Sequence, residues 1–259
     1  MVWHLREILP PGTRRRCFAS ELASCSDAIV AVSEAVASWV REEGLGDRVH
    51  VIPNGVEPPT AAPHHNDARK ILGVPGEGCL IGLFGQVVPH KGAREFLRAA
   101  RIALAEEGSL RFAIAGSGPP AFLAVLKREL SQGPRAERFH FLAPQLSSDR
   151  LTAAADVVCL STTVPDPLPR SVLEAMSAGK PVAAFRSGGT EEMVLHGVTG
   201  LLVEVGDVEG LAQSFVRLAR DPGLRRTLGA AAALRAREFF SLDLHLDRME
   251  LLFGELAER

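Results

Sequence analysis

Residues 156–185, DVVCLSTTVPDPLPRSVLEAMSAGKPVAAF, decide the fold of this chain. The apolar runs at 156–160 and 181–185 are short and bounded by turn-forming residues, so each predicts a buried strand. A proline-rich loop and a helical pattern lie between them. A strand, a helix and a second strand in this order are typical of the units that build a parallel α/β sheet.

The same alternation extends in both directions along the chain. Helical patterns start at Ser33 and at Lys91-Gly92, and three more follow from about residue 207. Other apolar runs predict strands at 27–32, 48–52, 79–84, 110–115, 138–142 and 200–203. The sequence therefore predicts an α/β protein with a parallel sheet.

A natural boundary between domains lies at residues 53–66, where four prolines disfavour regular structure. Too few strands precede this linker to make a domain. Residues 1–52 are therefore interpreted as the remnant of a first α/β domain, and residues 67–240 as a complete second one. We expect the helix within 241–259 to pack back on the N-terminal part.

The composition excludes several classes of protein. The 259 residues are 46% hydrophobic and 23% charged, as in ordinary globular proteins, and the net charge of -2 gives no reason to expect a nucleic-acid partner. We expect no signal peptide and no membrane span. The four cysteines lack the spacing of a metal site or of a disulfide framework, so a cytoplasmic protein is predicted. Arg14-Arg15-Arg16 is interpreted as a solvated helix face, with peripheral contact to an anionic membrane as the alternative.

Ligands of parallel α/β sheets bind beyond the carboxyl ends of the strands, so the loops there form the candidate site. In loop 85–92, Lys91 stands at the start of a helix, where its ammonium and the helix dipole would both favour a phosphate. A solvated surface lysine also fits Lys91. Loop 116–121 matches G-x-G-x-x-A, but no acid for a ribose follows the next strand, so a tight strand-to-helix turn explains it better than a dinucleotide site.

Two carboxylates near the strand at 156–160 are eight residues apart in the sequence. Asp166 falls in the loop and Glu174 in the first turn of the helix, so both can face one ligand at the carboxyl edge of the sheet. Ser171 and Glu174 also match a capping box, in which Glu174 would only satisfy helix N–H groups. Spacing alone leaves both interpretations open.

Further short motifs occur in a fixed order along the chain. They are Ser33-Glu34, Ile52-Pro53-Asn54-Gly55-Val56, Gly85 with Lys91-Gly92, Gly116-Ser117-Gly118-Pro119, Gly188-Gly189-Thr190-Glu191-Glu192 and Gly197 to Val203. With the spacing of Asp166 and Glu174, they resemble the retaining glycosyltransferases of family 4, which have the GT-B fold. The resemblance implies a Rossmann-like, doubly wound donor domain, with most of the N-terminal acceptor domain missing or supplied as a separate chain.

The resemblance also implies the ligand and a role for individual residues. A nucleotide-diphosphate sugar would be the donor, facing an unknown acceptor (a glycan, a lipid-linked or a small molecule). Lys91 would neutralise the departing diphosphate, Asp166 would contact the donor sugar, and Glu174 would accept hydrogen bonds from ribose hydroxyls. The other implied donor-site residues are Arg170 and Ser171, whose backbone N–H groups would bind phosphate, Gly85 and Gln86 in the first loop, and Leu142 and Leu146 in the base pocket.

Transfer in this family is expected to retain the anomeric configuration, with stabilisation of the leaving group as the main contribution. The sequence has no D-x-D motif, and His64-His65 lies in the linker without partner ligands, so we expect neither a metal nor another cofactor. On the acceptor side, the segment from Trp3 resembles an edge strand and its loop. Arg6 falls where many members place a histidine, and His4 lies two residues earlier.

Three positions in the donor site depart from the family pattern. Gln86 replaces a usual arginine, Asp166 a glutamate and Pro169 a glycine. Arg170 or Arg186 could supply the missing positive charge. These departures leave a catalytically incomplete nucleotide-sugar-binding fragment as the alternative to an enzyme domain, with another GT-B enzyme class as a third hypothesis.

Overall fold

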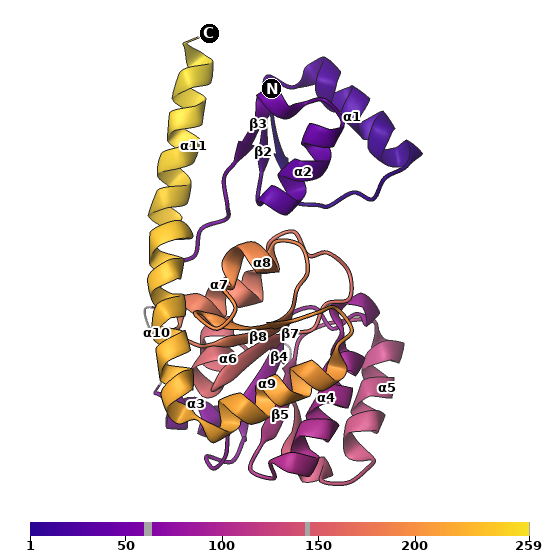
Figure 1. Cartoon of the computed structure of the whole chain (residues 1–259), viewed down its shortest axis with the longest axis vertical. Helices are drawn as coiled ribbons and strands as arrows, with labels where there is room; N and C mark the ends of the chain where they lie inside the picture. Colours follow the sequence, from indigo (N-terminus) through magenta and orange to yellow (C-terminus); the bar gives the residue numbers. More distant parts are fainter. Residues whose placement is uncertain (60–63, 143–145, 259) are drawn as a thin grey trace.

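The structure is a computed structural model that describes residues 1–59, 64–142 and 146–258. Within these residues the strands form two separate parallel sheets (Figure 1). The first contains β1 (Val2–Leu5), β2 (Ala28–Ala31) and β3 (Val49–Val51) in that order. The second contains β4 (Leu80–Phe84), β5 (Arg111–Ala115), β6 (Phe139–Leu142), β7 (Val157–Leu160), β8 (Val182–Phe185) and β9 (Gly200–Val203).

The second sheet has the order β6-β5-β4-β7-β8-β9, and all its pairs are parallel. The chain winds outward from β4 in one direction, then returns to β7 and winds outward in the other. This order confirms the doubly wound, Rossmann-like α/β fold, with its topological switch point between β4 and β7. The strands predicted from apolar runs are confirmed to within one residue at each end.

The helices connect and cover the strands. They are α1 (Thr13–Cys25), α2 (Glu34–Glu42), α3 (His65–Leu72), α4 (Ala93–Glu106), α5 (Pro120–Ser131), α6 (Ser148–Ala154), α7 (Arg170–Ser177), α8 (Thr190–Met193), α9 (Val208–Arg220), α10 (Pro222–Phe239) and α11 (Leu242–Ala257). The predicted start at Ser33 is confirmed, since its hydroxyl accepts from the Val36 N–H at 3.2 Å. The three helices predicted from about residue 207 are α9, α10 and α11.

Apolar side chains bury both faces of the second sheet. On one face, Phe96 of α4, Phe112 of β5 and Phe215 of α9 pack together with ring centroids 5.6–5.9 Å apart. Helices α3, α6, α7 and α10 contribute to the core on the other face. Because both faces are covered, the loops at the strand ends are the positions left for a ligand site.

Two segments of the chain, one near Val56 and one near Phe240, connect the two halves of the molecule. They lie side by side. The Val56 N–H donates to the Phe240 carbonyl at 2.8 Å, and His245 Nδ1 lies 2.8 Å from the Pro53 carbonyl oxygen. Helix α11 then runs along the first sheet, so that both termini lie at one end of the molecule (Figure 1). Leu252 of α11 is buried there against the β2 face.

The domain boundaries proposed at 52 and 66 stay predictions. Residues 60–63 of the proposed linker and residue 259 lie outside the described residues. Below, the N-terminal unit denotes residues 1–52 and the C-terminal unit residues 64–240.

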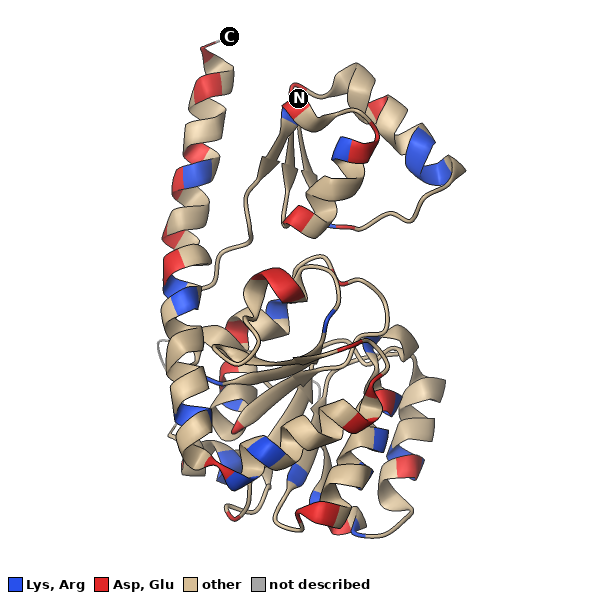
Figure 2. Ribbon diagram, viewed as in Figure 1, with Lys and Arg blue, Asp and Glu red and all other residues tan. Residues whose placement is uncertain are grey.

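The three arginines at the start of α1 do not form one solvated face, and that prediction is wrong for Arg15. Its side chain is buried and bonds to the Trp39 carbonyl at 3.0 Å and to the Glu42 carboxylate at 2.5 Å. Arg14 and Arg16 are exposed. Elsewhere, charges of both signs are interspersed along α11 and the helices around the second sheet (Figure 2).

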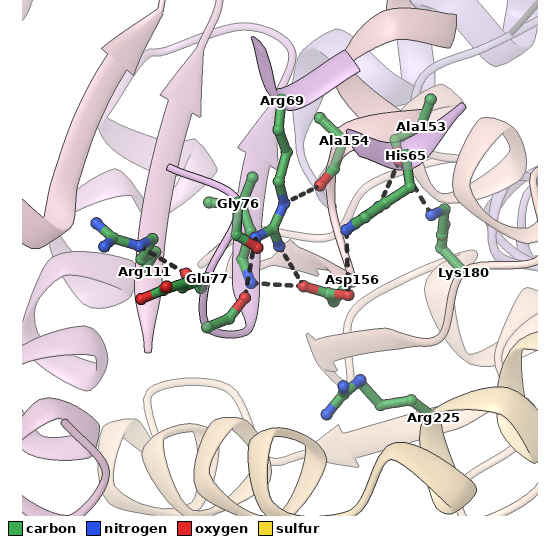
Figure 3. A network of polar contacts seen from close by, with 12 residues as sticks. His65, Arg69, Gly76, Glu77, Arg111, Ala153, Ala154, Asp156, Lys180 and Arg225 are labelled. Carbon is green, nitrogen blue, oxygen red and sulfur yellow. Dashed lines mark hydrogen bonds and ion pairs between the residues drawn. The ribbon is translucent and has the colours of Figure 1, made fainter. Parts of the chain in front are cut away.

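A buried arginine fastens α3 to the amino-terminal edge of the second sheet (Figure 3). Arg69 is 1% exposed, and its guanidinium lies 2.5 Å from the Asp156 carboxylate. The remaining N–H groups of Arg69 donate to carbonyl oxygens of Ala154, Gly76 and Gly78 at 2.8–3.1 Å. This contact joins the segments that lead into β4 and β7, the two strands at the switch point.

Asp156 also receives bonds that fix the strands themselves. Its Oδ2 accepts from the Leu80 N–H at 2.7 Å, at the first residue of β4. His65 Nδ1 lies 2.9 Å from the Ala153 carbonyl oxygen, to which Lys180 also donates at 3.2 Å. Burial lowers the pKa of Lys180. These bonds satisfy the first N–H of β4 and a carbonyl near the end of α6.

A different carboxylate, that of Glu192, joins the N-terminal and C-terminal units near the carboxyl ends of the strands. Glu192 of α8 accepts from the backbone N–H groups of Glu34 and Ala35 at 2.8 and 2.7 Å. These are orphan donors of the first turn of α2, where a negative charge is also favoured by the helix dipole. Glu192 of the C-terminal unit therefore caps a helix of the N-terminal unit.

We predict that Asp156→Ala lowers the free energy of unfolding by about 3–5 kcal/mol, because it leaves the buried Arg69 guanidinium without its counter-charge. Urea denaturation measures this change. The exposed Asp67→Ala on the same side of the molecule is the control and should cost less than about 1 kcal/mol. Equal losses for the two variants would contradict the role given to Asp156.

We also predict that Glu192→Ala speeds amide exchange at the start of α2, because two N–H groups lose a charged acceptor worth about 1–3 kcal/mol. Hydrogen exchange read out by mass spectrometry on the peptide around Glu34 measures this loss of protection. Glu191→Ala, which removes only an exposed pair with Arg186, should leave that peptide unchanged. No difference between the variants would show that the contact does not form in solution.

Candidate functional site

The candidate site lies where β4 and β7 end side by side at the switch point. The loop after β4 begins with Gly85 and passes through a short 3-10 helix, Pro89–Lys91, before α4. The loop after β7 runs from Ser161 to Pro169, where α7 begins. Both loops emerge at the carboxyl edge of a parallel sheet, which is where such sheets bind ligands.

Close backbone contacts hold the two loops together. Gly92 has a φ of +76° and lies so close to the Ser161 carbonyl that a Cβ would sit 1.6 Å from its oxygen. The Ser161 hydroxyl donates to the Gly92 carbonyl at 2.8 Å, and the Thr163 N–H donates to the His90 carbonyl at 2.9 Å. Only a glycine fits at position 92, and this fit fixes the place of Lys91.

The structure brings Lys91 and Asp166 together as an ion pair. Lys91 Nζ lies 2.5 Å from Asp166 Oδ2. The Asp166 side chain is 6% exposed, whereas that of Lys91 is 27% exposed. The lysine is therefore the more accessible partner, and an incoming anion could reach its ammonium.

A glycine turn before α8 supports the loop that carries Asp166. The Gly189 N–H donates to the Asp166 carbonyl at 2.8 Å. At Gly188, where φ is +54°, a Cβ would sit 2.3 Å from the same oxygen. The two glycines thus pack against the Asp166 backbone.

The start of α7 differs from the capping-box prediction. Pro169 is the N-cap residue, and no side chain caps the helix. The Val172 and Leu173 N–H groups already bond to the Pro169 carbonyl, so Ser171 lies inside the helix and cannot act as its cap. The capping box is therefore wrong, and Glu174 lies in the second turn of α7 and not in the first, as predicted. Glu174 instead accepts a bond from Arg170 Nε at 2.7 Å.

Two adjoining hollows open over this edge of the sheet, with volumes of about 360 and 330 Å³. Lys91 and Asp166 line the first, and Leu146 and Glu174 line the second. The residues shared by both hollows are Phe84, Gly85, Gln86, Arg170 and Ser171. The topology thus gathers almost all the residues predicted for a donor site around one continuous depression.

Leu142 is the predicted site residue that lines neither hollow, as far as the described residues show. It ends β6 and is 7% exposed, within the core cluster. Residues 143–145, which separate it from Leu146, lie outside the described residues. Its place in a base pocket stays a prediction.

A third hollow of about 550 Å³ lies where residues 54–59 and α11 meet the C-terminal unit, with Arg6 of the N-terminal unit also lining it. Arg170 and Glu174 line one side, and Arg6 and His245 are also among its lining residues. His4 stacks against His245 with ring centroids 6.5 Å apart, and burial, followed by Arg6 and His245, lowers the pKa of His4. His245 lies on α11, far from the motifs in sequence, so no local signal pointed to it.

The remaining candidate groups lie away from the hollows. Arg186 pairs with Glu191 at 3.5 Å and with Glu204 at 3.3 Å, and lines none of the three. All four cysteines are free, and burial raises the pKa of Cys79 to about 12.

Across the described ranges, no group of three or more His, Cys, Asp or Glu could hold a metal ion. No helix in the described part of the chain is long and apolar enough to cross a bilayer.

Comparison with known proteins matches two parts of the chain to family models. The family model for glycosyl transferases group 1 matches residues 78–221, and that for glycosyltransferase family 4 matches residues 4–59. Among curated proteins, the chain is 31% identical over 92% of its length to an exopolysaccharide phosphotransferase of Streptomyces coelicolor. It is 32% identical over 74% of its length to a D-inositol 3-phosphate glycosyltransferase of Acidothermus cellulolyticus. It spans 24% and 45% of the lengths of these two relatives.

A solved structure of HepE from Anabaena, in complex with UDP and glucose, superposes on the chain with a TM-score of 0.86. The two are 26% identical, and the match covers 98% of this chain and 71% of that one. Both the N-terminal and the C-terminal sheets therefore have counterparts in one known protein. With a family model that covers more than half of its residues, the chain belongs to the group 1 glycosyl transferases.

Proposed function

We propose that this chain is the donor-binding part of a glycosyltransferase that moves a sugar from a nucleotide-diphosphate sugar to an acceptor, with retention of configuration. The observation that carries the proposal is the Lys91–Asp166 pair at the switch point, next to the start of α7. Support also comes from the similar Anabaena protein, which was solved with UDP, with UDP and glucose, and with UDP-glucose.

In this proposal the diphosphate lies between Lys91 and the first turn of α7. The backbone N–H groups of Arg170 and Ser171 have no bonded acceptor among the described residues, as is usual for the first turn of a helix. They would donate hydrogen bonds to phosphate oxygens, with the helix dipole adding to the attraction. Lys91 would neutralise the charge that develops on the diphosphate as the sugar leaves, which is the main contribution to catalysis.

The two carboxylates have different roles in this arrangement. Glu174 lies at the second hollow, where it would accept hydrogen bonds from ribose hydroxyls, while Leu146 contacts the base. Asp166 lies at the first hollow beside Lys91, where it would contact the donor sugar. Asp166 is one methylene shorter than the glutamate usual in the family. The glycine turn bonds to its backbone carbonyl and so fixes the position from which its carboxylate projects.

The N-terminal unit would lie on the acceptor side. The third hollow separates it from the donor site, and Arg6 and His245 face that space. We propose that the rest of the acceptor site comes from residues that this chain does not contain, in the same polypeptide or in a separate one. A metal ion or another cofactor is not part of the proposed reaction.

We predict that the chain binds one of UDP, GDP and ADP, and that Lys91→Ala weakens this binding about 10- to 100-fold because a charged contact to phosphate is lost. Isothermal titration calorimetry measures both. Lys70→Ala on α3, which removes an exposed lysine outside the hollows, is the control and should bind like the parent chain. If the folded parent chain binds none of the three, the donor-binding function is rejected.

We further predict that Glu174→Ala reduces the preference for a ribonucleotide over its 2′-deoxy form by about tenfold, because a charged acceptor for a hydroxyl is worth about 1.5–3 kcal/mol. Competition between the two nucleoside diphosphates measures the ratio. Glu191→Ala, outside the hollows, should keep the parent ratio. An unchanged ratio in Glu174→Ala would assign the ribose contact to another group.

A further inference from the structure

The charges that line the two donor hollows cancel, which is unexpected for a diphosphate site. The described lining residues include the cations Lys91 and Arg170 and the anions Asp166 and Glu174. Each cation is paired with one anion, at 2.5 and 2.7 Å respectively. A ligand with two or more negative charges would therefore be bound more strongly if one of these pairs opened.

The Arg170–Glu174 pair is the one that can open at little cost. The Arg170 side chain is 87% exposed, so its pair with Glu174 is screened by water and weak. Asp166 is 6% exposed in the other pair, so separating Lys91 from it would leave a nearly buried carboxylate unpaired. Ligand binding is expected to break the weaker contact.

Stability of the helix does not account for an arginine at position 170. Arg170 is the first residue of α7, where the positive end of the helix dipole repels a cation. Its partner Glu174 lies four residues later, which is the less favourable order for an ion pair within a helix. A cation placed against both local rules is typical of a functional position.

The place of Arg170 indicates what its guanidinium binds. Arg170 lines all three hollows, and it shares the first with Lys91 and the second with Glu174. The neutral Gln86 lines the same two donor hollows, and Arg186 is engaged elsewhere. Among the described lining residues, Arg170 is thus the cation, besides Lys91, that can face a diphosphate.

We propose that the Arg170 guanidinium leaves Glu174 when a nucleoside diphosphate binds and becomes the second cationic contact to the diphosphate. The same movement frees the Glu174 carboxylate for the ribose hydroxyls. Arg170 is then a specificity-determining residue that selects a diphosphate over a monophosphate. This inference rests on the proposed function and adds a residue and a ligand preference to it.

The test compares nucleoside diphosphate and monophosphate binding in Arg170→Ala by calorimetry, with whichever of UDP, GDP and ADP binds the parent chain. We expect the diphosphate to bind about 10- to 100-fold more weakly and the matching monophosphate to change less than about threefold. Gln86→Arg in the Arg170→Ala background should restore a preference for the diphosphate. Arg186→Ala should leave both affinities unchanged.

Thermal unfolding separates this role from a structural one. Removing a cation from the first turn of α7 should leave the melting temperature of Arg170→Ala unchanged or slightly higher. If the parent chain binds a diphosphate and Arg170→Ala binds it equally well, this inference is overturned and the proposed function stands. If Arg170→Ala instead binds both nucleotides more tightly, Arg170 only blocks Glu174, which also overturns the inference. A parent chain that binds no nucleotide rejects the proposed function itself.

Discussion

The buried ion pair between Arg69 and Asp156 is the interaction on which the arrangement of the second sheet depends. Charges removed from water are costly unless they are paired and hydrogen-bonded, and here all three guanidinium nitrogens of Arg69 donate while Asp156 Oδ2 accepts two bonds. The pair joins α3 to the first residues of β4 and to the residue before β7. Because it aligns the two strands at their amino ends, it also determines where their carboxyl ends lie, and hence where the switch point opens.

Local patterns were sufficient for most of the fold, because apolar runs and helix caps depend on neighbouring residues. The strands from β2 to β9 and the last three helices followed from such patterns, whereas β1 was expected only from the family resemblance. The burial of Arg15 and Arg69 did not follow from them, since each is a charged residue on a helix and pairs with a carboxylate distant in the sequence. The start of α7 was misjudged for a different reason: Ser171 and Glu174 have the right spacing for a capping box, but Pro169 begins the helix two residues earlier than that motif requires.

The candidate site was predictable to the extent that one topological rule determines it. Loops that follow adjacent parallel strands must meet at one edge, and this is why Lys91 and Asp166, distant in sequence, lie within bonding distance. Sequence spacing contained no information on which charges pair. It therefore missed the balance between Lys91, Asp166, Arg170 and Glu174, and it did not identify the residues around the third hollow, whose described lining comes from five separate segments.

The side-by-side passages of the chain near Val56 and Phe240 have a mechanical consequence. At Gly55, a Cβ would sit 2.5 Å from the Leu242 Cα, so the two backbones touch and a larger residue would force them apart. Because the two connections are bonded to each other at one place, sliding or separation of the units there would have to break these contacts. The Glu192 contact with α2 joins the units at a second place, so a rotation of one unit against the other would also have to break these two hydrogen bonds.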